Sequence, residues 1–145
     1  MSSERSITGQ TAVQRAVVLA LLFMMLGTAM ELYLLDHYED VEQLIPLLCI
    51  GVSLLMILLL FFSQSRVTRR IFKLVMALTA LSGVYGTYLH LVANFEFEQE
   101  MRPAAENWDL FTESLSGALP ALAPASMIVL ALIGYSYYLL ITHQQ

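Results

Sequence analysis

Residues 27–46, GTAMELYLLDHYEDVEQLIP, contain the pattern from which the architecture of this protein can be inferred. The stretch begins inside an apolar run that holds one acidic residue, Glu31, and it then passes through His37 and a group of acids before apolar residues resume. Two long apolar runs joined by a short polar link are typical of two membrane-spanning helices that turn outside the bilayer. We therefore expect a helical hairpin whose ionisable groups gather at the link.

The composition of the whole chain predicts an integral membrane protein. Of its 145 residues, 58% are hydrophobic and 13% are charged, whereas about a quarter of the residues of a soluble domain are charged. The mean hydropathy is +0.68. We expect residues 1–145 to form a single all-α domain in contact with the lipid bilayer. The single cysteine excludes an intrachain disulfide, and no basic and aromatic pattern predicts binding of nucleic acid.

Four apolar blocks are each long enough to cross a membrane. At about 1.5 Å per residue, roughly 20 helical residues span a hydrocarbon core of about 30 Å. We therefore predict a four-transmembrane-helix bundle that follows a cytoplasmic tail at residues 1–14. A signal peptide is an alternative for the first block, because Arg15 precedes it and Gly27-Thr28-Ala29 could be cleaved; cleavage would leave three spans. The four predicted spans are residues 16–35, 45–62, 71–92 and 121–141.

The charged residues are sorted between the links. Four basic residues lie around the link between the second and third blocks, and the positive-inside bias places this link and both termini in the cytoplasm. We expect a multi-pass membrane protein. The other two links then face outward, and they hold ten of the twelve acids against one base, Arg102. The basic residues are Arg66, Arg69, Arg70 and Lys73; the ten acids are Asp36, Glu39, Asp40, Glu42, Glu96, Glu98, Glu100, Glu106, Asp109 and Glu113.

The second outer link is predicted to contain a short interfacial helix at residues 102–117. Pro103 fits a first helical position and Gly117 fits a stop. Three apolar residues recur at helical spacing and would form one face on the membrane surface; an ordinary cap over the bundle is an equally good interpretation. These three residues are Trp108, Phe111 and Leu115.

An internal repeat is a further hypothesis. The residues Gly27-Thr28-x-x-Glu31 align with Gly86-Thr87-x-x-His90 at an offset of 59. Two tandem hairpins of this kind would be related by an axis along the membrane normal, which would place Glu31 and His90 at equivalent depths. Chance matching between apolar segments is the alternative.

Several segments resemble a known group of proteins. The runs ELYLLDHYEDVEQLIPL, HLVANFEFEQEMRP and GALPALAPASM are similar to a family of small bacterial four-transmembrane-helix proteins to which no activity is assigned. The resemblance covers most of residues 27–134, and its most specific part is the run from His90 to Glu98. It implies the four-span architecture and a location in the bacterial cytoplasmic (inner) membrane. It also draws attention to these residues.

The presence of Glu31 within an apolar span requires an explanation. A carboxylate within a spanning helix costs several kcal/mol unless it faces protein or water. It could form a hydrogen bond to His90, Tyr85 or Tyr88 that locks the bundle, accept a proton or a cation, or reach the interface. Residues six apart lie about 120° from alignment on a helix, so Glu31 and His37 cannot share one face. A site that unites the two outer stretches must form between the first and third spans.

Imidazole and carboxylate groups at the outward-facing end of the bundle favour binding of Zn²⁺, Mn²⁺ or Fe²⁺. No local metal motif is present, so such a site would have to be assembled by the fold. The clustered acids would concentrate cations there, although a solvated acidic rim is a simpler interpretation of them. A haem bound by two histidines is a further alternative. The candidate metal ligands are Glu31, His37, Glu39, His90, Glu96 and Glu98.

The sequence therefore favours a non-enzymatic membrane protein that binds or conducts a cation, either a divalent metal or a proton. We assign no catalytic residue, because no serine or cysteine triad is apparent. A structural or assembly subunit of a larger membrane complex, or of a homo-oligomer, is the alternative from a different class. A membrane metalloenzyme is the third.

Overall fold

The computed structural model describes residues 2–143, with side chains from Thr11 onward, and all of the regular secondary structure within these residues is helical. Four of its helical segments are long and apolar enough to cross a membrane, which confirms the predicted all-α, four-span architecture. A short helix, α4, lies between the third and fourth of them. The elements are α1 (Ser2–Leu34), α2 (Val41–Phe62), α3 (Arg66–Met101), α4 (Asn107–Ser114), the 3-10 turn η1 (Ala123–Ala125) and α5 (Ser126–Thr142).

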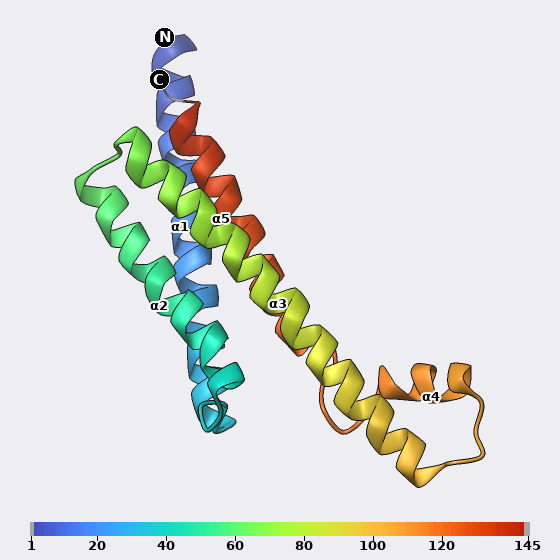
Figure 1. The fold of residues 1–145 in the computed structure, drawn as a ribbon. Coiled ribbons are helices and arrows are strands. Elements are labelled where there is room, and N and C mark those ends of the chain that lie inside the picture. The colour runs from blue at the N-terminus through green and yellow to red at the C-terminus, as the bar shows by residue number, and fades with distance from the viewer. Residues whose placement is uncertain (1, 144–145) are drawn as a thin grey trace.

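The four long helices pack as a ring. Helix α1 contacts α2 and α5, and helix α3 contacts the same two neighbours on its own sides. Figure 1 shows the start of α1, the end of α5 and the α2–α3 link at one end of the molecule, and the α1–α2 link and α4 at the other. At that second end, the α1–α2 pair and α3 diverge from each other.

The hydrophobic core lies between the four long helices. The ring of Phe72 packs edge-on against that of Tyr137, with 6.1 Å between the ring centroids. Burial of such apolar side chains against one another, rather than against lipid, gives van der Waals contacts that hold the four helices together. The side chains buried completely or almost completely here include Leu21, Met25, Ile50, Leu60, Phe72, Met76, Leu130 and Ile141.

Helices α3 and α5 approach each other closely at Gly83. A Cβ atom added to Gly83 would lie 2.9 Å from both Ile128 Cγ1 and the backbone oxygen of Pro124. Since both contacts are too short for a real carbon atom, only glycine allows the two backbones to pack at this distance. This contact fixes the outer half of α3 against the start of α5.

Two helices extend beyond the predicted apolar blocks. Helix α1 begins at Ser2 and so includes residues that the sequence assigned to a tail at 1–14. Helix α3 continues past residue 92 to Met101. Hydropathy marks only the part of a helix that lies in lipid, and the glutamate, glutamine and phenylalanine residues that follow are compatible with a helix in water.

The predicted helix at residues 102–117 is shorter than expected. Helix α4 begins at Asn107 after Glu106, and Pro103 lies in the turn between α3 and α4 rather than at a first helical position. One face of α4 is buried against the protein through Leu110 and Ser114. The other face is exposed, and it carries the apolar residues expected to meet the membrane surface: Trp108, Phe111 and Leu115.

The internal repeat stays a prediction. Its two matched glycines have different surroundings, because a Cβ atom on Gly27 would meet nothing within 4 Å whereas one on Gly86 would lie 2.8 Å from Pro124 Cβ. The aligned sequences therefore do not perform the same packing role in the two hairpins.

Candidate cation site at the acidic end

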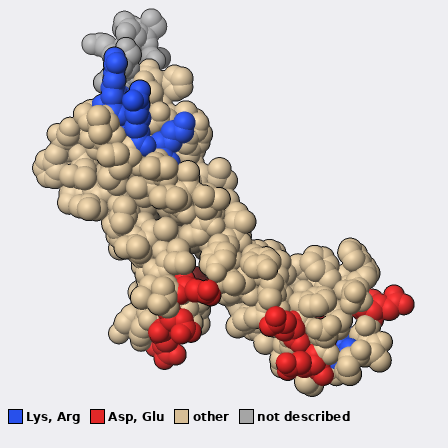
Figure 2. Space-filling view, viewed as in Figure 1, with Lys and Arg blue, Asp and Glu red and all other residues tan. Residues whose placement is uncertain are grey.

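The charges of the folded chain are separated along its length. Figure 2 shows the acidic side chains in two groups, one over the α1–α2 link and one over the outer end of α3 and α4, with basic side chains at the opposite end. We call the end that carries the acids of these two links the acidic end. Because charges of one sign raise the local concentration of counter-ions, this end attracts cations from solution.

The link after α1 has a defined conformation that directs His37. The N–H of His37 donates to the carbonyl of Leu32 at 2.9 Å, and the N–H of Asp36 donates to that of Tyr33 at 3.2 Å. Asp36 has a φ of 52°, so the helix ends in a Schellman motif with a left-handed residue after it. This reversal brings His37 back beside the helix it follows.

The same link is fixed at its other end, where α2 begins. The side-chain oxygen of Gln43 accepts hydrogen bonds from the backbone N–H groups of Glu39, at 2.9 Å, and Asp40, at 3.3 Å. These donors have no partner within the helix, so a side-chain acceptor at this position stabilises the helix start. The loop that carries His37 is thus held at both ends.

The structure brings His37 next to His90 of α3. Their ring centroids are 6.3 Å apart, and the ring planes meet at 68°. Both side chains are half-buried. This pair, which we call the histidine pair, joins the α1–α2 link to α3, as expected for a site between the first and third spans.

The protonation of the histidine pair is set by its surroundings. His90 Nδ1 lies 3.2 Å from the carbonyl oxygen of Pro120. Because a carbonyl oxygen only accepts, Nδ1 carries a proton and the Nε2 atom of the neutral ring keeps its lone pair. Burial, and secondarily the charge of His90, lower the pKa of His37, so the neutral form of this imidazole is favoured. A lone pair on a neutral imidazole is what a transition metal binds.

A second contact ties α2 to α3 near the pair. The hydroxyl of Tyr85 donates to Glu42 Oε1 at 3.1 Å. Tyr85 was one of the residues expected to bond Glu31, but its partner is this other carboxylate. Sequence reasoning missed the contact because Glu42 and Tyr85 belong to different hairpins and share no local pattern.

Glu31 itself does not join the histidine pair through any hydrogen bond. Its side chain is exposed on the surface of α1, and its carboxylate makes no hydrogen bond or ion pair with another residue in the described part of the chain. The expected bond from Glu31 to His90, Tyr85 or Tyr88 is therefore not formed. The helix turns this carboxylate outward because the buried face of α1 is formed by Leu21, Met25 and Thr28.

The remaining candidate ligands do not converge on the pair. Glu39 and Glu96 are exposed, and Glu98 accepts a hydrogen bond from Arg102 at 2.8 Å within α3. Among the described residues, no group of three or more histidine, cysteine, aspartate or glutamate side chains is close enough to hold a metal ion. Of the six predicted ligands, only His37 and His90 form a ring contact with each other.

Asn94 holds in place the segment that supplies the hydrogen-bond partner of His90. This buried side chain donates to the carbonyls of Ser114, at 2.9 Å, and Leu119, at 2.7 Å, and accepts from the N–H of Leu119 at 3.0 Å. It thereby fixes the segment that contains Pro120, the partner of His90. The signal in the sequence was a polar amide one helical turn after His90, although its partners could not be inferred.

Comparisons with known proteins identify no family. The chain matches no protein-family model, no curated protein and no solved structure. The resemblance to a bacterial four-span family stays a prediction, and what the structure supports is the presence of four long apolar helices.

Proposed function

We propose that this membrane protein binds a divalent transition-metal ion at its acidic end, with His37 and His90 as the two protein ligands. The observation that supports this most strongly is the separation of 6.3 Å between the two ring centroids. At a Zn–N distance of about 2.0–2.1 Å, two imidazoles on one tetrahedral zinc ion have centroids roughly 5 Å apart. Side-chain rotations that bring the two rings about 1 Å closer would therefore let the histidine pair share an ion.

The chemistry of the two rings agrees with this role. The lowered pKa of His37 favours its neutral form. The Nδ1–H of His90 bonds a backbone carbonyl, which is the outer contact that commonly orients a metal-bound histidine through its other nitrogen. Water molecules would complete the coordination, because the carboxylates of Glu31, Glu39 and Glu96 do not converge on the pair. The same two rings would also accept protons, which is the second form of cation handling.

Isothermal titration of the detergent-purified protein with Zn²⁺, Mn²⁺ and Fe²⁺ tests this function. We expect stoichiometric heat with at least one of the three ions, and we expect His37→Ala and His90→Ala each to abolish it. The matched control is His143→Ala, since His143 is exposed beyond the end of α5 at the opposite end of the molecule. Binding that is unchanged in both histidine variants would exclude the pair as ligands, and a Soret band in the purified protein would favour haem instead.

We further propose that the acidic end faces outward and that both termini are cytoplasmic. The support is the gathering of Arg66, Arg69, Arg70 and Lys73 in the first turns of α3, at the end of the molecule where α1 begins and α5 ends (Figure 1). In a Cys49→Ser background, a membrane-impermeant maleimide should label Glu106→Cys in intact cells and not Gln64→Cys. The reverse labelling pattern would contradict this orientation.

The outward position of Glu31 supports a second candidate function, assembly with other subunits. A carboxylate exposed near the end of a spanning helix is stabilised when a neighbouring chain offers it a hydrogen-bond donor. If assembly is the role, native mass spectrometry in lipid discs should show a complex that Glu31→Gln preserves and Glu31→Ala weakens. A monomer under these conditions would exclude self-assembly.

A further inference from the structure

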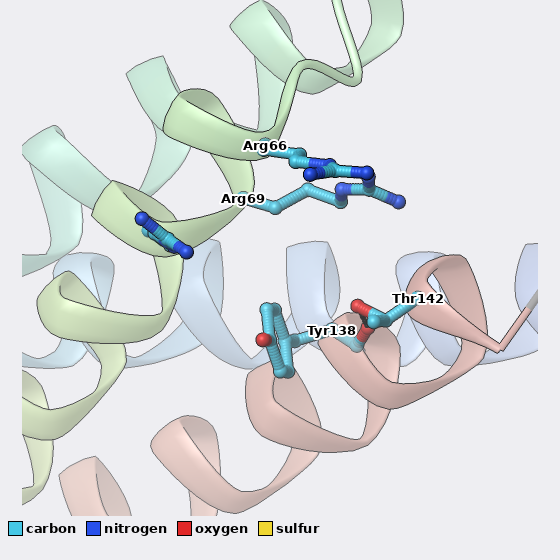
Figure 3. Close-up of a pocket in the computed structure, with 5 residues that line it drawn as sticks. Arg66, Arg69, Tyr138 and Thr142 are labelled. Carbon is cyan, nitrogen blue, oxygen red and sulfur yellow. Dashed lines mark hydrogen bonds between the residues drawn. The ribbon is translucent and has the colours of Figure 1, made fainter. Parts of the chain in front are cut away.

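An open cavity of about 340 Å³ lies at the end of the molecule opposite the histidine pair, between the start of α3 and the end of α5. Figure 3 shows the side chains of Arg66 and Arg69 extending from α3 towards Thr142, with Tyr138 of α5 beside them. We call this the basic cavity. Its lining consists of Arg66, Arg69, Arg70, Tyr138 and Thr142.

The walls of the basic cavity are fixed by contacts between the two helices. Arg69 is buried, and its Nη1 donates to the carbonyl of Ile141 at 3.1 Å, which ties α3 to the last turn of α5. Ser65 caps α3 by accepting from the N–H of Thr68 at 3.1 Å. Since both wall-forming helices are held in place, the exposed guanidinium groups of Arg66 and Arg70 are presented by a rigid frame.

A fourth cation adjoins the cavity. The ammonium group of Lys73 lies 5.7 Å from the ring centroid of Tyr138 and 5.9 Å from that of Tyr135, both within the range of a cation–π interaction. Lys73 is thus held against the tyrosine that lines the cavity. Its charge adds to those of the three arginines.

The electrostatics of the basic cavity favour an anion. No acidic side chain is among its lining residues, and the acids of the α1–α2 link and of the segment around α4 lie at the other end of the molecule (Figure 2). The cavity also lies at the N-terminus of α3, where the backbone dipole is positive. Guanidinium groups bind phosphate oxygens through paired, charge-assisted hydrogen bonds, and the hydroxyls of Tyr138 and Thr142 supply further donors.

The surface beside the cavity is apolar. Val67, Ile71 and Leu74 lie on one face of α3 and are exposed, and the apolar block of this helix begins at residue 71. The cavity is therefore at the level where lipid head groups meet acyl chains. We propose that the basic cavity binds the phosphate group of an anionic phospholipid, with an acyl chain along these three apolar side chains.

Native mass spectrometry of the full chain, with phosphatidylglycerol, cardiolipin or phosphatidylcholine added at known concentration, tests this proposal. We expect retention of the two anionic lipids in preference to phosphatidylcholine. Each of Arg66→Gln and Arg70→Gln should weaken anionic-lipid binding about fivefold, and the double variant roughly 25-fold. Arg66→Lys and Arg70→Lys should weaken binding less, because they keep the positive charge. A graded loss of this kind shows that the glutamine variants act on the binding site and not on the fold.

Two controls distinguish this site from other sources of affinity. Arg15→Gln removes an exposed positive charge from α1 without touching the cavity lining, so it should bind anionic lipid like the wild type. An equal loss in Arg15→Gln would show diffuse attraction and overturn the proposal. Excess inorganic phosphate should not displace the lipid; complete displacement would identify free phosphate as the ligand and likewise overturn it.

Discussion

The imidazole rings of His37 and His90 meet edge to face with 6.3 Å between their centroids, although one ring follows α1 and the other belongs to α3. The contact joins the α1–α2 link to α3, and the α1–α2 pair and α3 diverge at this end of the molecule (Figure 1). The bond from Tyr85 to Glu42 likewise joins α3 to the α1–α2 pair. The proposed cation would strengthen this junction.

The stability of the protein should fall as the pH is lowered through the range in which histidine titrates. The pKa of His37 is lower in the folded protein than its ordinary value of 6.5, chiefly through burial. The unfolded chain therefore takes up its proton first as the pH falls. The contribution of neutral His37 to the free energy of unfolding is therefore complete above about pH 6.5. It is lost as the pH falls through the pKa that His37 has in the folded protein.

Melting midpoints measured from pH 8 to pH 5 check this prediction. The decrease should be smaller in His37→Gln than in the wild type, because glutamine does not titrate. His143→Gln serves as the control and should keep the full decrease. An identical pH dependence in the wild type and His37→Gln would contradict the assignment.

Asn94→Ala should release the segment between α4 and α5. The change removes three hydrogen bonds to Ser114 and Leu119 and leaves backbone groups without partners, at a cost of about 2–4 kcal/mol. Hydrogen–deuterium exchange should become faster in residues 103–122 while α1 and α2 are unaffected. Gln99→Ala, on an exposed position of the same helix, should leave exchange unchanged, and unchanged exchange in Asn94→Ala would refute the role of this amide.

Two glycine-to-alanine variants should change the free energy of unfolding in different ways. Gly83→Ala places a carbon atom against Ile128 and the backbone of Pro124, so it should lower the free energy of unfolding by about 1–3 kcal/mol. Gly51→Ala meets nothing within 4 Å and should be neutral or stabilise its helix by up to about 1 kcal/mol. Unfolding in mixed micelles measures both, and equal effects would show that the α3–α5 contact is looser than described.

Asp36 should control the position of His37 through its backbone. Its φ of 52° is readily adopted by glycine but disfavours a branched side chain by about 1–2 kcal/mol. Asp36→Gly should therefore preserve zinc affinity, whereas Asp36→Val should reduce it. The comparison by isothermal titration separates positioning from ligation, because neither variant alters an imidazole, and equal affinities would show that the turn does not matter.

The four spans could be predicted because about 20 consecutive apolar residues have no other common use in a chain of this composition. The true ends of α1 and α3 could not, because polar residues continue a helix in water without any signal in hydropathy. The start of α4 was misplaced for a related reason, since Pro103 is equally suited to a turn and to a first helical position.

The candidate site was predictable only in part. The spacing of Glu31 and His37 led us to predict a site between the first and third spans, and this site stays a prediction. It did not reveal that the turn at Asp36 would bring His37 to His90, because a left-handed residue other than glycine has no reliable sequence signature. The partners of Asn94 and the basic cavity both depend on contacts between residues far apart in sequence, which a single sequence does not report.

X-ray absorption at the zinc edge of the zinc-loaded protein tests the central claim most directly, because it reports the ligands of the ion itself. We expect the scattering signature of two imidazole rings with Zn–N distances of about 2.0–2.1 Å, reduced to one ring in His37→Ala or His90→Ala if any zinc is retained. A spectrum without imidazole scattering, or one that is the same in both variants as in the wild type, would contradict a cation site built on His37 and His90.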